Sequence, residues 1–297
     1  MKPSKKIKII VTHNGKFHAD DVFAVATVSL VFGKKFRLIR TRDENIISKG
    51  DIVIDVGGVY NNKRNRFDHH QMLGAGKRKN GIPYSSLGLV WKKFGREVCG
   101  DKKISDYLDK RFIQQIDAVD NGFDIAKLKF DVPSYNISDV IDAWVPAWDE
   151  KVDTDKAFQK AVDIAKKILQ REIIKAKSKF KAEKFVKAAY YKSRDKRIIV
   201  LDKYYPSQEL AVNFMPKTKF IIYPQNGVWS VRATRRNLLD FKIKNPFPRS
   251  WSGKRDGELI KISGIKDAIF CHRNLFLAVA KSREGAIRLA KIALNKK

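Results

Sequence analysis

Short apolar runs alternate with helix-like segments over the first third of the chain. The runs at 7–11, 36–41 and 51–56 have the length of buried strands, and residues 21–32 follow a helical pattern. The third run stops at a glycine pair, where the backbone can turn sharply. Strands that alternate with helices predict an α/β fold whose mainly parallel sheet is flanked by helices.

Helical spacing continues through the middle of the chain. It predicts a helix over 83–94 that ends at Gly95, and a second helix over 104–119. A third predicted helix, over 156–191, contains neither Gly nor Pro and is rich in Lys. We interpret residues 156–195 as a long basic helical connector between two domains.

The last third changes to strand-like segments closed by one helix. The predicted elements are strands at 198–201, 220–223, 228–233, 268–271 and 275–279 and a helix over 283–294. This order predicts a smaller mixed α+β domain. The expected organisation is a first domain at 1–155, the connector at 156–195 and a C-terminal domain at 196–297.

Charge indicates the kind of partner. The 297 residues include 62 Lys and Arg but only 32 Asp and Glu, which gives a formal net charge of +30. Such a charge raises the affinity for polyanions such as RNA or DNA in a salt-dependent manner. The alternative is Lys enrichment for solubility, which needs no such partner.

The cysteine content and the apolar runs indicate the compartment. The chain has two cysteines, too few for a disulfide framework, which favours a reducing intracellular environment, the cytoplasm if the source is prokaryotic. No apolar run reaches the roughly 20 residues that a membrane span requires, and no secretory signal is recognised. We therefore expect an intracellular protein without a membrane partner.

Histidines are concentrated in two short segments. The chain has five, at positions 13, 18, 69, 70 and 272, and four of them lie near the N-terminus. Asp68 immediately precedes the adjacent pair His69 and His70, and this mixture of oxygen and nitrogen donors suits zinc, manganese or iron. Both segments follow strand-like runs, and parallel sheets bind ligands beyond the carboxyl ends of their strands.

Several side chains are candidate ligands for two divalent ions. They are His13, His18, Asp20, Asp55, Asp68 and His69. Asp20 could instead cap a helix, and Asp55 could merely end a strand before the glycine turn. Two ions held by a shared carboxylate can activate water and stabilise a phosphoryl transition state. The donor set therefore favours phosphoester hydrolysis.

Longer motifs resemble a known family. They are Thr12 to Asp21, Asp55 to Tyr60, Phe67 to Gln71, Asp117 to Gly122, Trp251 to Leu259, Ser263 to Ile265 and Arg283 to Ala286. In this order they resemble the Myg (melanocyte-proliferating-gene protein) family of the DHH phosphoesterase superfamily. The resemblance spans nearly the whole chain.

The resemblance implies a DHH-type catalytic domain, a C-terminal substrate-binding domain and two manganese-type ions. Eukaryotic Myg proteins are regarded as 3′ to 5′ exoribonucleases. The implied metal ligands are His13, His18, Asp20, Asp55, Asp68, His69 and Asp120. Asp120 is favoured over Asp117 because a turn follows it directly.

The mechanism that we expect has Asp55 between two metals, which lower the pKa of a water molecule to about 7. Asp68 is then a ligand or an orienting carboxylate. His70, if it is not a ligand, faces the phosphate and offsets its developing charge. Asp55, Asp68 and His70 are thus the expected catalytic residues.

The C-terminal domain offers candidate substrate contacts. Arg249, Lys254, Arg255 and His272 could grip a phosphate or sugar. Trp251 could stack on a base or pack in the core. One departure concerns residues 275–282, where the resemblance implies a glycine-rich stretch. The bulkier residues found there could prevent backbone N–H groups from approaching a phosphate.

Three functions are consistent with the sequence. The first is an exonuclease that acts on single-stranded RNA or short oligonucleotides. The second is a small-molecule phosphoesterase or pyrophosphatase, which would need no extended basic surface. The third is a nucleic-acid-binding protein without turnover, although all four N-terminal motifs retain candidate ligands. The oligomeric state stays open.

Overall fold

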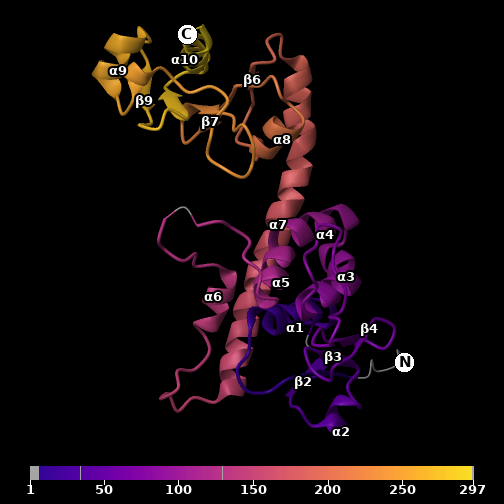
Figure 1. Ribbon diagram of the computed structural model, residues 1–297. Helices are drawn as coiled ribbons and strands as arrows, with labels where there is room; N and C mark the ends of the chain where they lie inside the picture. Colours follow the sequence, from indigo (N-terminus) through magenta and orange to yellow (C-terminus); the bar gives the residue numbers. More distant parts are fainter. Residues whose placement is uncertain (1–6, 34, 129, 296–297) are drawn as a thin grey trace. The chain divides into compact units, whose positions relative to one another are not determined.

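A computed structural model describes residues 7–33, 35–128 and 130–295 of the chain. The chain divides into two compact units, Met1–Lys177 and Ser178–Lys297. Their boundary falls within the long helix α7 (Thr154–Lys192), which is labelled in Figure 1. Each unit contains its own five-stranded sheet.

The sheet of the first unit has the strand order β2-β1-β3-β5-β4. Its strands are β1 (Lys8–Thr12), β2 (Phe36–Arg40), β3 (Ile52–Ile54), β4 (Tyr60–Asn61) and β5 (Arg66–Phe67). All neighbouring pairs are parallel except β4 with β5. The predicted mainly parallel sheet is therefore confirmed.

Helices cover this sheet. They are α1 (Ala19–Phe32), α2 (Glu44–Ile47), α3 (Ser86–Cys99), α4 (Lys102–Leu108), α5 (Gln114–Asp120) and α6 (Ile137–Asp142). Residues 19–29 of α1 are all buried, because α1 is apolar around most of its circumference and packs against α3, α5 and α6. This central helix carries acidic side chains into the interior.

The prediction that a helix ends at Gly95 is wrong. Helix α3 continues to Cys99 and stops at Gly100, whose φ of 73° lies in the left-handed region that favours glycine. Gly95 instead allows close packing, since a Cβ atom there would lie 2.7 Å from Ser105 Oγ and 2.9 Å from the Trp91 ring. The glycine thus serves a helix contact.

The helix predicted over 104–119 is observed as three consecutive helical segments. The π-helical turn η1 (Asp109–Ile113) lies between α4 and α5. The hairpin of β4 and β5 was not predicted, because two-residue strands are too short to show a period of two.

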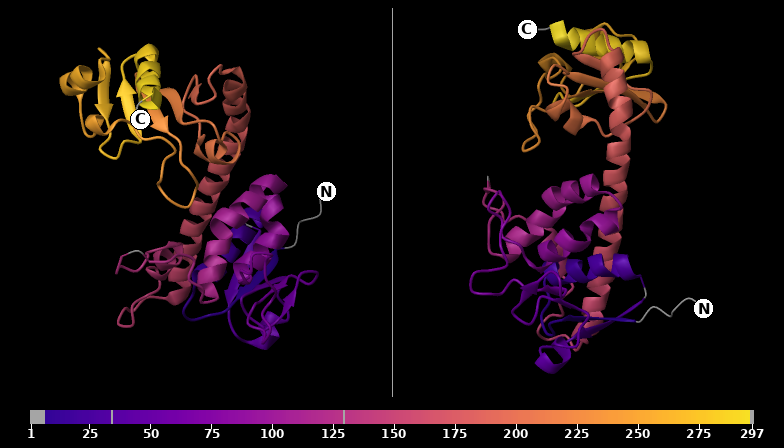
Figure 2. Two further views of the ribbon diagram at one scale, coloured as in Figure 1. Left: turned by 45° about the horizontal axis from the view of Figure 1, so that its top comes forward. Right: turned by 90° about the vertical axis from the view of Figure 1, so that its right-hand side faces the viewer.

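The second unit is a mixed α+β structure, as predicted. Its sheet order is β6-β7-β8-β10-β9, where β6 pairs with β7 in parallel and the other pairs are antiparallel. The strands are β6 (Ile198–Val200), β7 (Phe220–Gln225), β8 (Val228–Ala233), β9 (Ala268–Cys271) and β10 (Leu277–Ala280). The helices are α8 (Gln208–Asn213), η2 (Arg249–Trp251), α9 (Asp256–Ser263) and α10 (Arg283–Asn295). Helix α10 packs against β7, β8, β9 and β10 (Figure 2).

Strand β10 begins two residues later than predicted. Leu275 has a φ of 58° in the turn after β9, which removes it from the strand. Among the described residues, no helix is long and apolar enough to cross a membrane.

Candidate metal centre

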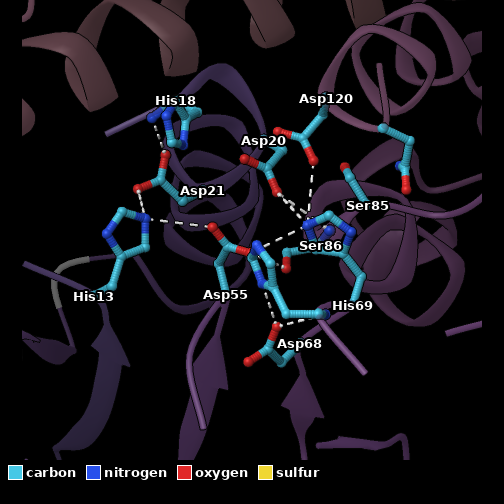
Figure 3. A network of polar contacts seen from close by, with 12 residues as sticks. His13, His18, Asp20, Asp21, Asp55, Asp68, His69, Ser85, Ser86 and Asp120 are labelled. Carbon is cyan, nitrogen blue, oxygen red and sulfur yellow. Dashed lines mark hydrogen bonds and ion pairs between the residues drawn. The ribbon is translucent and has the colours of Figure 1, made fainter. Parts of the chain in front are cut away.

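The candidate ligands meet at one edge of the first sheet. His13 directly follows β1, Asp55 follows β3 and Asp68 follows β5, and these parallel strands all end at the same edge. Asp55 has a φ of 56°, a left-handed conformation that is uncommon outside glycine and that often marks a functional position. Figure 3 shows these side chains converging with acids from the helices.

Two acids enter from the first turn of α1. Asp20 and Asp21 are completely buried, whereas His18 at the N-cap position is exposed. Oδ1 of Asp21 accepts hydrogen bonds from the backbone N–H groups of His18 (2.9 Å) and Val22 (2.7 Å). Its second oxygen faces His13.

Asp55 presents a different oxygen to each of two histidines. Its Oδ2 lies 3.3 Å from Nε2 of His13, and its Oδ1 lies 3.5 Å from Nε2 of His69. His13 Nε2 is also 3.1 Å from Asp21 Oδ2, and His69 Nε2 is 3.2 Å from Asp120 Oδ2. The Asp55 carboxylate therefore connects two separate sets of donor atoms (Figure 3).

Within the described part of the chain, three groups have donor atoms close enough to share a metal ion. In each group the donor atoms lie within 4.8 Å of one another. The groups are Asp55, His69 and His70; His13, Asp21 and Asp55; and His18, Asp20 and Asp120. Asp55 belongs to two of these groups.

The charges of the site depend on hydrogen bonds. Burial alone would lower the pKa of His13, but hydrogen bonds with Asp21 and Asp55 outweigh burial and raise the pKa to about 10. Burial acts in the same direction on His69, and its bonds with Asp120 and Asp55 likewise raise the pKa to about 10. At neutral pH the imidazole rings of His13 and His69 therefore carry a proton and a positive charge, at the position where a cation would bind.

The pKa values of the Asp55 and Asp20 carboxylates are shifted in opposite directions. Burial would raise the pKa of Asp55, but hydrogen bonds with His13, His69 and Ser86 hold it far below its ordinary value. Burial and the charges of Asp55 and Asp120 raise the pKa of Asp20 well above its ordinary value. Oδ1 of Asp20 is buried and accepts no hydrogen bond from an N–H or hydroxyl group of the described residues. A buried acceptor without a donor fits a bound cation.

Asp68 orients its neighbour. Its Oδ1 lies 2.8 Å from Nδ1 of His70 and accepts the backbone N–H of His70 at 3.1 Å, while Oδ2 accepts the N–H of Gly58 at 2.6 Å. Asp68 belongs to none of the three donor groups found among the described residues. Of the two roles expected for this carboxylate, the geometry favours the orienting one.

Residues at the N-terminus of α3 donate hydrogen bonds to the buried acids. The Ser86 hydroxyl donates to Asp55 Oδ1 at 2.8 Å, and the Ser86 N–H donates to Asp20 Oδ2 at 3.3 Å. The Ser85 hydroxyl donates to Asp117 Oδ1 at 2.6 Å. The bond from Ser86 helps to lower the pKa of Asp55, whereas burial outweighs the bond from Ser85 and raises the pKa of Asp117 to about 6.

Asp117 and Asp120 occupy different positions. Asp117 is buried and paired with Arg78, whose Nη1 lies 2.6 Å from Asp117 Oδ2. Asp120 instead faces His69 and lines a cavity of about 330 Å³. Of the two carboxylates, Asp120 therefore belongs to a group of possible metal donors, whereas Asp117 forms an ion pair in the interior.

The cavity has a wall that sequence reasoning did not identify. Its lining comprises His18, Ala19, Asp55, His69, His70, Val119, Asp120, Ser138, Asp139 and Asp142. The last three belong to α6, and Asp142 forms an ion pair with Lys16 at 3.0 Å. Helix α6 has only six residues, so its periodicity gave no signal.

Asp21 and Ser86 were also not assigned to the site. The adjacent acids at 20 and 21 were visible in the sequence, but their separate partners depend on the rotation of α1. Ser86 looked like an ordinary residue near a helix start. Only the packing of α3 against α1 brings it to Asp55.

The residues predicted in the C-terminal domain are not all accessible. Trp251 is completely buried and stacks against Phe247, with ring centroids 6.0 Å apart, so its ring packs in the core and offers no free face to a base. Arg249 and Arg255 are exposed, and Lys254 forms an ion pair with Glu258 at 3.1 Å. Of the five predicted residues, His272 lines a cavity of the second unit.

Residues 275–282, where the family resemblance implies a glycine-rich stretch, include a β-strand. Residues Leu277–Ala280 form β10, which pairs with β8 on one side and β9 on the other. Both edges of this strand are occupied by sheet pairing, so its backbone N–H groups are engaged. Any contact of this strand with a phosphate would therefore come from its side chains.

Comparison with known proteins extends over nearly the whole chain. Residues 9–294 match the MYG1 exonuclease family model, described as an uncharacterised protein family (UPF0160). The chain is 33% identical to the MYG1 protein of Dictyostelium discoideum, over 96% of both chains. It is 32% identical to the MYG1 exonuclease of Bos taurus and 31% identical to that of Homo sapiens, over 96% of this chain and 84% and 85% of those proteins.

Proposed function

The chain belongs to the MYG1 family, and from this premise we propose that it is a metal-dependent phosphodiester hydrolase. The proposed reaction is 3′ to 5′ exonuclease cleavage of RNA or short oligonucleotides. The observation that carries the proposal is that Asp55 presents one oxygen to each of two donor groups. The names of the mammalian relatives and the net charge of +30 support a nucleic-acid substrate.

We assign two divalent ions, Mn²⁺ in the first instance, to the donor groups. Asp55 would bridge, with His13 and Asp21 on one side and His69 on the other. Asp120, which lies 3.2 Å from His69, would complete the set together with His18 and Asp20. The third member of the group with Asp55 and His69 is His70, whose Nδ1 is held by Asp68 and which is assigned to the phosphate instead. Such a pair of ions supplies water activation near neutral pH and stabilises phosphoryl charge. The catalytic role lies in the first unit and substrate binding in the second.

His70 has the geometry of a phosphate-binding group. Its side chain is 62% exposed, and Nδ1 is held by Asp68. The hydrogen bond with Asp68 raises the pKa of His70, so the ring keeps its proton more readily. Nε2 can then donate a hydrogen bond to a phosphate oxygen as negative charge develops there.

Metal binding is expected to release protons. In the metal-free protein at neutral pH, His13 and His69 are protonated because their pKa values are raised to about 10. Each must lose a proton before its nitrogen can bind a cation, so Mn²⁺ affinity should fall as the pH falls. Titration calorimetry in buffers of different ionisation enthalpy measures this release. His13→Ala should reduce it and His272→Ala should not; heats independent of buffer would contradict the assignment.

The proposed activity is tested with single-stranded RNA labelled at its 3′ end. We expect labelled mononucleotide to appear first, with Mn²⁺ and not with EDTA. Parallel reactions with single-stranded DNA, a dinucleotide and pyrophosphate define the substrate class. Cleavage of pyrophosphate alone would replace the exonuclease proposal by the small-molecule alternative. RNA binding without turnover in any metal would favour the non-catalytic alternative.

A further inference from the structure

A second cavity lies in the C-terminal unit, with a volume of about 440 Å³. This is within the range of about 300 to 1,000 Å³ that is typical of small-molecule pockets. Its lining combines cationic, aromatic and amide side chains and contains no Asp or Glu. The cationic and aromatic residues of this lining, together with its histidine, are Arg232, Arg235, Phe241, His272, Arg273 and Phe276.

Three arginines from two segments of the chain line this cavity. Arg232 lies in β8, Arg235 lies just after that strand and Arg273 lies in the turn between β9 and β10. None of the three lies within ion-pair distance, 4.0 Å, of a described carboxylate, whereas Arg78 and Arg197 elsewhere are paired. Guanidinium groups gathered without an acidic partner favour a bound anion, and their planar donors suit phosphate oxygens.

His272 adds a directed donor. Its Nδ1 accepts the backbone N–H of Asn274 at 3.0 Å, so a neutral ring carries its proton on Nε2. The ring is also held by Phe276, with centroids 4.3 Å apart. The fixed tautomer gives the cavity a hydrogen-bond donor in addition to the arginines.

Phe241 supplies an aromatic surface. It is 85% exposed, although its segment is fixed by a bridge between Arg235 and Ile243 and by the Asn237 side chain, which accepts the N–H of Leu239 at 2.7 Å. The Arg235 guanidinium carbon lies 4.6 Å from the Phe241 ring centroid. An exposed ring beside cationic donors matches a ligand that has both an aromatic face and a phosphate.

We propose that this cavity binds one nucleotide, with its phosphate at Arg232, Arg235, Arg273 and His272 and its base against Phe241. If the proposed nuclease function holds, the bound nucleotide is part of the substrate strand, and only this identification of the ligand rests on the proposed function. The same chemistry would bind a free nucleoside monophosphate. Binding here needs no metal, because every contact is made by side chains of the second unit.

The test measures binding to the full chain in EDTA, so that it is independent of hydrolysis. The probes are 5′-AMP, adenosine, inorganic phosphate and a 5′-phosphorylated trinucleotide. We expect 5′-AMP to bind more tightly than adenosine or phosphate. Tighter binding of the trinucleotide than of 5′-AMP would assign the cavity to the strand, and equal binding would assign it to the free mononucleotide.

Two variants and one control locate the site. Arg235→Ala should weaken 5′-AMP binding about tenfold or more. Phe241→Ala, which changes an exposed side chain and so leaves folding intact, should weaken it about fivefold and leave phosphate binding unchanged. Arg194→Ala removes the same charge from an exposed position outside the cavity and should have little effect.

Other outcomes would overturn the proposal. Equal losses in Arg235→Ala and Arg194→Ala would indicate nonspecific charge attraction. An unchanged affinity in Phe241→Ala would reduce the cavity to a simple anion site. Loss of metal-dependent hydrolysis in Asp55→Asn with intact 5′-AMP binding is expected, and it keeps this proposal separable from the hydrolytic one.

Discussion

Asp55→Asn is expected to lower the rate of RNA hydrolysis by about 10³-fold or more. Asn has nearly the same shape as Asp, so the bond from the Ser86 hydroxyl, 2.8 Å long, can be kept. The change removes the negative charge that lies 3.3 Å from His13 and 3.5 Å from His69. Because this carboxylate belongs to two donor groups, its loss should impair both proposed metal positions at once.

Turnover and metal stoichiometry measure the effect of Asp55→Asn. We expect the variant to bind fewer than two Mn²⁺ ions per chain in equilibrium dialysis, with its thermal unfolding in EDTA recorded as a check on folding. Asp163→Asn is the matched control, since Asp163 is an exposed acid on α7. Unchanged hydrolysis in Asp55→Asn would rule out the bridging role and the mechanism built on it.

Local pattern and one topological rule were sufficient to predict that His13 and Asp55 lie at the same edge of the sheet. The runs that became β1 and β3 were apolar, and the carboxyl ends of parallel strands meet at one edge. His13 and Asp55 could therefore be placed together from sequence. Two-residue strands carry too little pattern, so the β4–β5 hairpin that presents Asp68 was not predicted.

Contacts between helices could not be read from sequence. Ser86 reaches Asp55 only because α3 packs on α1, and Asp21 reaches His13 only through the rotation of α1. The sequence pattern predicts that Gly95 ends a helix, whereas in the fold it permits close contact with Ser105. In each case the role depends on a partner distant in sequence.

The C-terminal cavity shows the same limit more clearly. Arg232, Phe241 and His272 lie on segments that no spacing rule connects, and the pairing of β8 with β10 brings two of those segments together. Trp251 illustrates the reverse case, since the sequence left base stacking and core packing open and the fold buries the ring completely. The net charge of +30 indicated a polyanionic partner, whereas the position of the cavity became visible only in the folded structure.

His70→Ala is expected to lower kcat by about 10² to 10³-fold while leaving Mn²⁺ affinity nearly unchanged. The reason is that His70, unlike His69, has an exposed ring whose Nδ1 is already bonded to Asp68 at 2.8 Å. Its nearest approach to Asp55, 3.6 Å, also uses Nδ1, the atom held by Asp68. Nε2 is therefore the nitrogen left to donate to the phosphate.

Asp68→Asn tests the orienting role of Asp68 separately from the hydrogen bond that His70 donates to the phosphate. The variant keeps the His70 imidazole but lacks the Asp68 carboxylate, which in the native protein orients the ring and raises the pKa of His70. We therefore expect kcat to fall by less than in His70→Ala, about 10-fold to 100-fold. Single-turnover hydrolysis and Mn²⁺ titration of both variants decide between the roles. If His70→Ala lost one Mn²⁺ ion per chain, His70 would be a metal ligand, and the donor to the phosphate would have to be sought among the other residues that line the cavity.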